Sequence, residues 1–147
     1  MAQPRRARAA LLAVLVLAWA PSPALRAQKD DDKKPSLSLK ANPPLGFSPL
    51  RVRAVVDVRG GANDYEEFYC PTVEWDWGDG TVSANGEDCN PYVAGQSEIR
   101  RRFSAEHVYR YSGSYRVAFR LKQKDRVVAT AASGVQVRSG AREDFGR

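Results

Sequence analysis

The chain has 147 residues, with 23 basic and 17 acidic side chains, a formal net charge of +6 and a sequence pI of about 9.6. This length suffices for one domain with a proper core and is too short for two typical domains. Two cysteines and one distant histidine are also too few ligands for a structural zinc site.

The first 27 residues have the pattern of an export signal. A basic stretch over residues 5–8 precedes an apolar run over residues 9–20, and the small residues Ala24 and Ala27 offer cleavage points. This run is short for a membrane-spanning helix, which needs about 20 residues. We predict that residues 1–27 are a signal peptide cleaved after Ala27, and that the protein is exported to the periplasm or beyond the cell. A retained N-terminal anchor is the alternative.

Cleavage of this segment would lower the net positive charge of the protein. Residues 1–27 hold four arginines and no acidic residue, so the rest of the chain carries 19 basic and 17 acidic side chains. The small remaining excess, together with export, argues against nucleic acid as a partner. No second long apolar run follows, so we expect no membrane insertion after cleavage. We also expect the protein to be a monomer.

The ends of the remaining chain are polar, whereas apolar and polar residues alternate in its middle. Residues 28–35 form a charged linker and residues 139–147 a polar tail, neither with anything apolar to bury. Between them, short alternating segments are separated by clusters of Gly, Pro, Asn and Asp, without a long helical stripe. This pattern predicts an all-β fold, an antiparallel β-sandwich of about seven strands.

The clearest alternation covers residues 50–58, and a second one covers residues 115–121. Residues 99–103 are less regular and suggest a short strand near a sheet edge. Residues 127–137 are small and β-branched, and we expect them to close the sheet. The predicted core consists of Val52, Val56, Trp75, Trp77, Tyr115, Val117, Phe119 and Leu121.

The most informative segment reads Trp-Asp-Trp-Gly-Asp-Gly-Thr over residues 75–81. Trp75 and Trp77 project from one face of a strand, while Asp76 points the other way. The two glycines around Asp79, Gly78 and Gly80, can supply the positive φ angles of a tight turn. This order resembles the signature of PKD domains, the immunoglobulin-like modules named after polycystic kidney disease protein.

Three further segments resemble the PKD pattern in the expected order. They are the Pro and Gly-rich opening over residues 41–50, a His-x-Tyr…Gly-x-Tyr block, and the closing strand over residues 135–137. The block consists of His107, Tyr109, Gly113 and Tyr115. The resemblance implies a PKD-like, immunoglobulin-like domain over residues 36–138. It also implies a non-catalytic role in protein–protein or protein–carbohydrate contacts at the cell surface or in the periplasm.

Two connections, residues 60–70 and 81–105, are longer than the family's usual links. Loops on a rigid sandwich are where binding residues usually lie, so we predict that these insertions carry the specificity. Their aromatic side chains suit a protein interface or sugar stacking. The candidate partner-binding residues are Tyr65, Phe68, Tyr69 and Tyr92.

Cys70 and Cys89 lie nearly equidistant from Asp79, which marks the tip of the predicted turn. Positions equidistant from a hairpin tip can lie opposite each other on antiparallel strands, close enough for a disulfide. An exported protein meets an oxidising compartment. We therefore predict a structural Cys70–Cys89 disulfide that ties the bases of the two insertions together.

The residues that could carry chemistry each have a structural interpretation. Asp79 suits a turn, and Asp76 can accept backbone hydrogen bonds from the neighbouring loop; paired carboxylates for acid–base work are the alternative. We expect His107 to pack against the end of a sheet and to make a hydrogen bond. No Ser or Cys lies in a recognisable nucleophile motif, so no enzymatic activity is predicted.

A second class of function remains open, namely a calcium-binding or small loop-based hydrolytic protein. It depends on acidic residues of both insertions converging near the disulfide, although their spacing matches no EF-hand loop. The candidate ligands are Asp64, Glu66, Glu67, Glu87 and Asp88. Otherwise no cofactor is predicted. A third possibility is an accessory subunit of a larger exported assembly.

Arginines gather on the outward faces of the predicted strands. One strand carries Arg51, Arg53 and Arg59, a run covers residues 100–102, and another strand carries Arg116 and Arg120. A solvated sheet surface accounts for such a pattern. The alternative is an anionic partner, such as an acidic polysaccharide or an acidic protein face.

Overall fold

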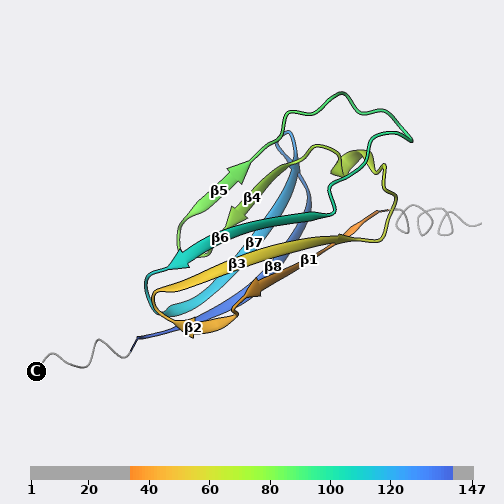
Figure 1. Cartoon of the computed structure of the whole chain (residues 1–147). Coiled ribbons are helices and arrows are strands. Elements are labelled where there is room, and N and C mark those ends of the chain that lie inside the picture. The colour runs from red at the N-terminus through yellow and green to blue at the C-terminus, as the bar shows by residue number, and fades with distance from the viewer. Residues whose placement is uncertain (1–33, 141–147) are drawn as a thin grey trace, which may run out of the picture.

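The computed structural model describes residues 34–140, in which eight strands form two sheets packed face to face (Figure 1). The predicted signal peptide, most of the charged linker and residues 141–147 of the tail lie outside the described residues. The smaller sheet has the order β1 (Ser36–Asn42), β3 (Leu50–Arg59) and β6 (Arg102–Tyr109). The larger sheet has the order β2 (Leu45–Phe47), β8 (Arg126–Arg138), β7 (Gly113–Gln123), β4 (Thr72–Asp76) and β5 (Val82–Asn85).

The predicted all-β sandwich is confirmed. The apolar residues of β3 and β7 alternate with polar ones, and their inward side chains form the centre of the core. Six of these are fully buried: Val52, Ala54, Val56, Val117, Phe119 and Leu121. Between residues 34 and 140, the structure contains no helix with the length and hydropathy of a membrane span.

The predicted core needs one correction and ten additions, of which three are large aromatic residues. Tyr115 is only half-buried, because it lies near the start of β7 and packs its ring on Tyr109 at the end of the sandwich. Tyr109, Phe68 and Phe103 belong to the core instead, each with at most 5% of its surface exposed.

The strand prediction was incomplete at the two edges of the larger sheet. Two short strands, β2 and β5, were not predicted as separate strands, and β2 runs parallel to β8, so the larger sheet is not wholly antiparallel. β2 has three residues between prolines, and proline confines a strand to the edge of a sheet. β8 consequently lies between β2 and β7 and does not form the edge of the sheet.

The segment expected to be a long insertion over residues 81–105 is partly strand. Its beginning forms β5, and its end belongs to β6, one continuous edge strand that also contains the His-x-Tyr block. The remaining loop covers residues 86–101. Together with residues 60–71, which include the 3₁₀ turn η1 (Glu66–Phe68), it forms one end of the sandwich, called here the insertion end (Figure 1).

The two sheets do not match in width. β6 packs on β7 through the Phe103–Phe119 ring contact and on the end of β4 through His107 and Trp77. β5 is the outermost strand of the larger sheet, so it extends beyond the edge of the smaller one. A groove is left between β5 and β6 as a result.

Candidate functional site

The Gly-Asp-Gly turn joins β4 to β5 and binds β6 of the opposite sheet. Gly78 and Gly80 have φ values of 77° and 90°, as predicted, and a Cβ at Gly78 would lie 2.7 Å from the backbone oxygen of Arg116. Asp79 Oδ1 accepts hydrogen bonds from the Thr81 amide (3.0 Å) and hydroxyl (2.6 Å). Its Oδ2 accepts a hydrogen bond of 2.6 Å from His107 Nε2. The turn therefore links the two sheets.

His107 is held on its other sides by aromatic rings. Its imidazole stacks on Trp77 with centroids 4.7 Å apart and meets the ring of Tyr109 edge-on. The hydrogen bond to Asp79 orients the imidazole. The packing and the hydrogen bond predicted for His107 are therefore both present.

Low pH should weaken the hydrogen bond between Asp79 and His107. Burial raises the pKa of Asp79, but hydrogen bonds from Thr81 and His107 outweigh it, so the pKa lies below its usual value of 3.8. A lowered folded-state pKa means that the carboxylate stabilises the fold fully above about pH 4 and that this contribution is lost as the pH falls through the lowered pKa.

We expect an Asp79→Asn variant to be less stable than wild type by about 1–2 kcal/mol at pH 7, because the charged acceptor is lost. The difference should shrink towards pH 2. Urea unfolding across this range measures it, and a difference that stays constant with pH would contradict the assignment.

Asp76 and Asp79 bind different partners and do not form an acid–base pair. Asp76 Oδ1 accepts a hydrogen bond from the Gly78 amide (3.1 Å), and its Oδ2 lies 3.3 Å from Arg120 Nη2 on the outer face of the larger sheet. Arg120 also pairs with Glu74 at 2.7 Å. Hydrogen bonds from Lys122 and Arg120 hold the pKa of Glu74 below its usual value.

The His-x-Tyr…Gly-x-Tyr block fixes the opposite end of the sandwich. The buried hydroxyl of Tyr109 donates a 2.8 Å hydrogen bond to the carbonyl oxygen of Trp77, and burial raises the pKa of this phenol well above its usual range. Tyr109 stacks on Tyr115 with centroids 4.2 Å apart. Tyr115 in turn donates a hydrogen bond to the Tyr111 carbonyl, and a Cβ at Gly113 would meet its ring. These residues support the fold.

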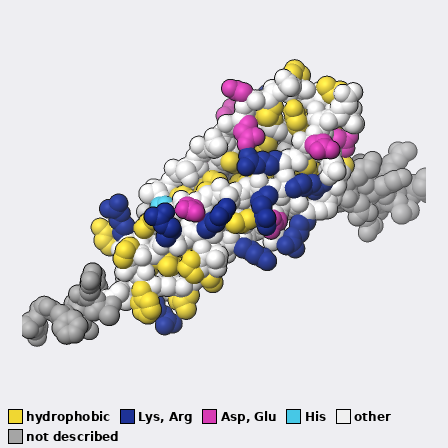
Figure 2. Space-filling view, viewed as in Figure 1, with side chains coloured by type: hydrophobic (Ala, Val, Ile, Leu, Met, Phe, Trp, Pro, Cys, Tyr) yellow, Lys and Arg dark blue, Asp and Glu magenta, His cyan; other side chains and the backbone are white. Residues whose placement is uncertain are grey.

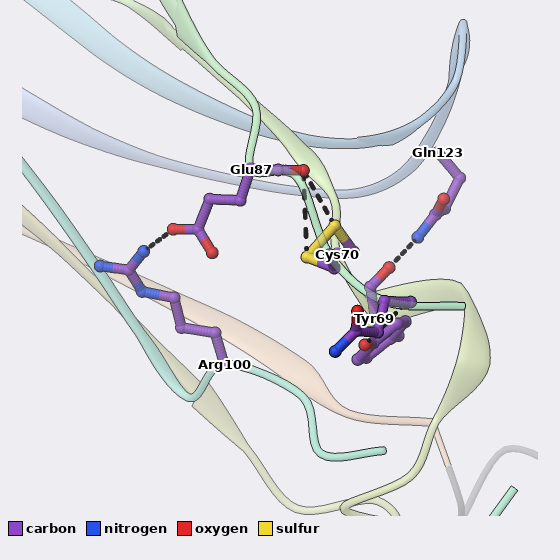
Figure 3. The surroundings of a disulfide bond; sticks show 7 residues. Tyr69, Cys70, Glu87, Arg100 and Gln123 are labelled. Atoms are coloured by element: carbon purple, nitrogen blue, oxygen red, sulfur yellow. Dashed lines mark hydrogen bonds and ion pairs between the residues drawn. A yellow bond between two sulfur atoms is a disulfide. The ribbon is translucent and has the colours of Figure 1, made fainter. Parts of the chain in front are cut away.

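The predicted Cys70–Cys89 disulfide is confirmed (Figure 3). The cysteines do not lie on the paired strands: Cys70 precedes β4 and Cys89 follows β5. The disulfide therefore closes the base of the β4–β5 hairpin at the insertion end. The carbonyl oxygen of Glu87 contacts Cys70 Sγ at 3.0 Å. Gln123 Nε2 donates a hydrogen bond to the Tyr69 carbonyl oxygen, which ties this region to the end of β7 (Figure 3).

The two insertions meet through polar contacts that the sequence did not predict. Arg101 donates hydrogen bonds to the carbonyl oxygens of Gly60 and Gly61 and to Asn63 Oδ1. The Ile99 amide donates to the Asn63 carbonyl oxygen at 2.8 Å. Nothing in the sequence of three consecutive arginines predicted that Arg101 would bind carbonyl oxygens of the other loop.

The candidate aromatic residues mainly build the insertion end. Phe68 is 1% exposed, so its assignment as an exposed contact residue is wrong; η1 turns its ring into the core, edge-on to Tyr65. Tyr65, Tyr69 and Tyr92 are half-buried. The Tyr69 hydroxyl donates to the Asn90 carbonyl oxygen (3.0 Å), and the Tyr92 hydroxyl donates to the Asp64 carbonyl oxygen (2.6 Å). Burial and the nearby Asp64 raise the pKa of Tyr92.

The five candidate calcium ligands do not converge. Asp64 accepts a hydrogen bond from the Gly95 amide, Glu67 pairs with Arg126, and Glu87 pairs with Arg100. The hydrogen bond from Arg126 is the main cause of the lowered pKa of Glu67. Glu66 and Asp88 are exposed. In residues 34–140, no group of three or more His, Cys, Asp or Glu side chains is placed to hold a metal ion.

The groove between β5 and β6 has a volume of about 240 Å³ and begins at the insertion end. Its floor is apolar, and its walls are the two strand edges. Arg100 lies at one end of the groove, paired with Glu87 and with its guanidinium carbon 5.2 Å from the centroid of Phe103. The lining residues are Pro71, Val73, Trp75, Ser83, Ala84, Asn85, Glu87, Arg100, Phe103, Ser104 and Ala105.

No protein-family model matches this chain, and no curated protein matches it. Among solved structures, a PKD domain of an M14-like peptidase from a Thermoplasmatales archaeon is 13% identical, with 71% of this chain and 97% of that chain covered and a TM-score of 0.48. A CARDB domain from Pyrococcus furiosus, solved in complex with di-metal ions, is also 13% identical, with 71% and 94% covered and a TM-score of 0.42. A superoxide reductase (neelaredoxin) from Ignicoccus hospitalis is 11% identical, with 74% and 85% covered and a TM-score of 0.42. These likenesses concern the fold, and nothing about ligands or activity follows from them.

Proposed function

We propose that this PKD-like β-sandwich is an exported, non-catalytic binding module whose β5–β6 groove receives an extended segment of a partner protein. The observation that carries this proposal is that two unpaired strand edges border one apolar groove. An extended peptide can add a strand to an exposed edge, with main-chain hydrogen bonds giving affinity and alternate side chains giving specificity.

The direction of the β5 backbone supports strand addition. The Trp77 amide donates to the Thr81 carbonyl oxygen at 3.1 Å, and in an antiparallel pair the residues that bond across the ladder alternate with residues that do not. Ser83 is therefore bonded to β4, whereas the N–H and C=O of Ala84 point away from β4, at the open edge of the larger sheet.

The same reasoning applies to β6. The Val58 amide donates to the Arg101 carbonyl oxygen at 2.9 Å, so Phe103 bonds to β3 and the backbone of Ser104 points away from it. Ala84 and Ser104 both line the groove. An incoming strand would thus find free backbone donors and acceptors at the edge of β5 or of β6, beside the apolar residues of the groove.

The sequence of β5 lacks the usual protection of an edge strand. Natural edge strands carry charges, prolines or bulges that prevent pairing with other chains. β5 reads Val-Ser-Ala-Asn, all four residues are exposed, and none of them is charged. β6, by contrast, has Arg102 and Glu106 on its outward face. We take β5 as the strand to which the partner pairs.

The disulfide is consistent with an oxidising compartment outside the cytoplasm. The interaction with a partner is also compatible with an accessory role in a larger exported assembly. Calcium binding or loop-based hydrolysis is less well supported, because the acidic residues of the insertions are engaged with different partners.

Peptide binding by an Ala84→Pro variant tests the proposal. Proline removes the N–H at the open edge of β5 but leaves the bonds to β4 intact, so the variant should fold like wild type. Peptides selected from a displayed random library on wild-type protein should bind Ala84→Pro at least about tenfold more weakly, a loss of roughly 1.4 kcal/mol.

Ala84→Val is the matched control, since it keeps the N–H and should bind these peptides like wild type. Binding of the selected peptides to Ala84→Pro with unchanged affinity, or a selection that yields no peptide, would overturn strand addition. Heat of calcium binding that vanishes with chelator would favour the metal-binding alternative.

A further inference from the structure

Charge is distributed unevenly over the two faces of the sandwich. The outward positions of β1, β3 and β6 carry five basic side chains and two acidic ones. We call this surface the arginine face; its basic members are Lys40, Arg51, Arg53, Arg59 and Arg102. Figure 2, viewed from this side, shows Lys and Arg side chains in a band over β3 and β6 with few acidic neighbours.

Ion pairs leave part of this charge uncompensated. Arg51 pairs with Glu106 at 3.4 Å and Arg102 with Asp57 at 2.9 Å, which uses both acidic side chains of the face. The remaining three basic residues, Lys40, Arg53 and Arg59, are exposed, and no acidic side chain of residues 34–140 forms an ion pair with them.

The outer face of the larger sheet differs. There Arg120 pairs with both Glu74 and Asp76, and Lys122 pairs with Glu74. Arg116 on β7 and Arg138 on β8 form no ion pair with an acidic side chain of residues 34–140. The outer face of the larger sheet thus has two unpaired cations, against three on the arginine face, where the unpaired positive charge is greatest.

We propose that the arginine face binds an acidic polysaccharide, a surface and ligand separate from the strand-binding groove. A hydrated polyanion fits this face because its recognition needs cations and short polar groups and no apolar centre. Only Val55 and Val108 are apolar among its outward residues, and the positions between the cations include Ser38 and Asn42. Hydroxyl and amide side chains of this kind can hydrogen-bond to sugar hydroxyls.

Other anionic partners fit this face less well. A stable protein interface has an apolar core, often with aromatic residues, and the arginine face has neither. Single-stranded nucleic acid is bound on aromatic side chains, and duplex DNA is read by an element that enters a groove; this flat sheet face offers neither. Arg51 and Arg59 lie eight residues apart on β3, so the face presents cations over about 26 Å, which suits a linear polymer.

Binding of the exported protein to polygalacturonate tests this proposal, with neutral dextran as the uncharged polymer. We expect saturable binding to polygalacturonate that weakens with added salt and no binding to dextran. The Arg53→Ser/Arg59→Ser variant should bind at least about tenfold more weakly, because two uncompensated cations are lost.

Arg116→Ser/Arg138→Ser is the matched control, since it removes the same net charge from the larger sheet, where both residues are exposed. Its affinity for polygalacturonate should change by less than about twofold. Equal losses in the two variants would show that net charge alone attracts the polymer, and would overturn the assignment to this face. Equally tight binding of polyglutamate or DNA would overturn the assignment to polysaccharide. The Ala84→Pro variant should keep its polygalacturonate binding, which separates this site from the groove.

Discussion

Replacement of Trp75 by Ala should destabilise the domain by about 3–5 kcal/mol, a large part of the 5–15 kcal/mol that holds a typical domain folded. The indole is 4% exposed, stacks on Trp77 with centroids 5.8 Å apart and meets the ring of Phe119 edge-on at 4.7 Å. Its removal would leave a cavity between the sheets and enlarge the floor of the β5–β6 groove. Urea or thermal unfolding followed by circular dichroism measures the loss.

Phe47→Ala is the control for this experiment. Phe47 is also aromatic, but 62% of its surface is exposed at the edge of the larger sheet, so its removal should cost well below 1 kcal/mol. A Trp75→Ala protein that melts within a degree or two of wild type would show that the core assignment is wrong.

Loss of the disulfide should have the second largest effect. Cys70 and Cys89 are 19 positions apart, and by the chain-entropy model a bond that closes a loop of this size contributes about 3 kcal/mol. In a Cys70→Ser/Cys89→Ser protein we expect this loss of stability with far-UV circular dichroism retained, because the bond lies outside all eight strands.

Binding in the groove should suffer more than the fold does. The disulfide closes the hairpin that carries β5. Glu87, two residues before Cys89, forms the ion pair with Arg100 at the end of the groove (Figure 3). A looser hairpin raises the entropy cost of ordering this edge for a partner. Peptides selected on wild-type protein measure the effect; full affinity in the double variant would separate the disulfide from binding.

Local pattern was sufficient for much of the fold. The period-two alternation of β3 and β7 placed Val52, Val56, Val117 and Phe119 in the core, because side chains of a strand point alternately to its two faces. The Gly-Asp-Gly turn was equally readable, since a tight turn needs positive φ angles that glycine adopts without strain. The disulfide followed from two cysteines placed on either side of that turn.

The properties that concern function depend on contacts between distant parts of the chain. From the sequence Phe68 was predicted to be an exposed loop residue, but η1 places its ring in the core. Arg101 was expected on the surface, but it donates hydrogen bonds to the carbonyl oxygens of Gly60 and Gly61. The groove exists because β5 extends beyond the edge of β6, and the cross-strand pairs Arg51–Glu106 and Arg102–Asp57 decide which cations of the arginine face stay unpaired. Alternation states which residues face inward, but sheet order and cross-strand register decide which edges stay open and which charges are paired.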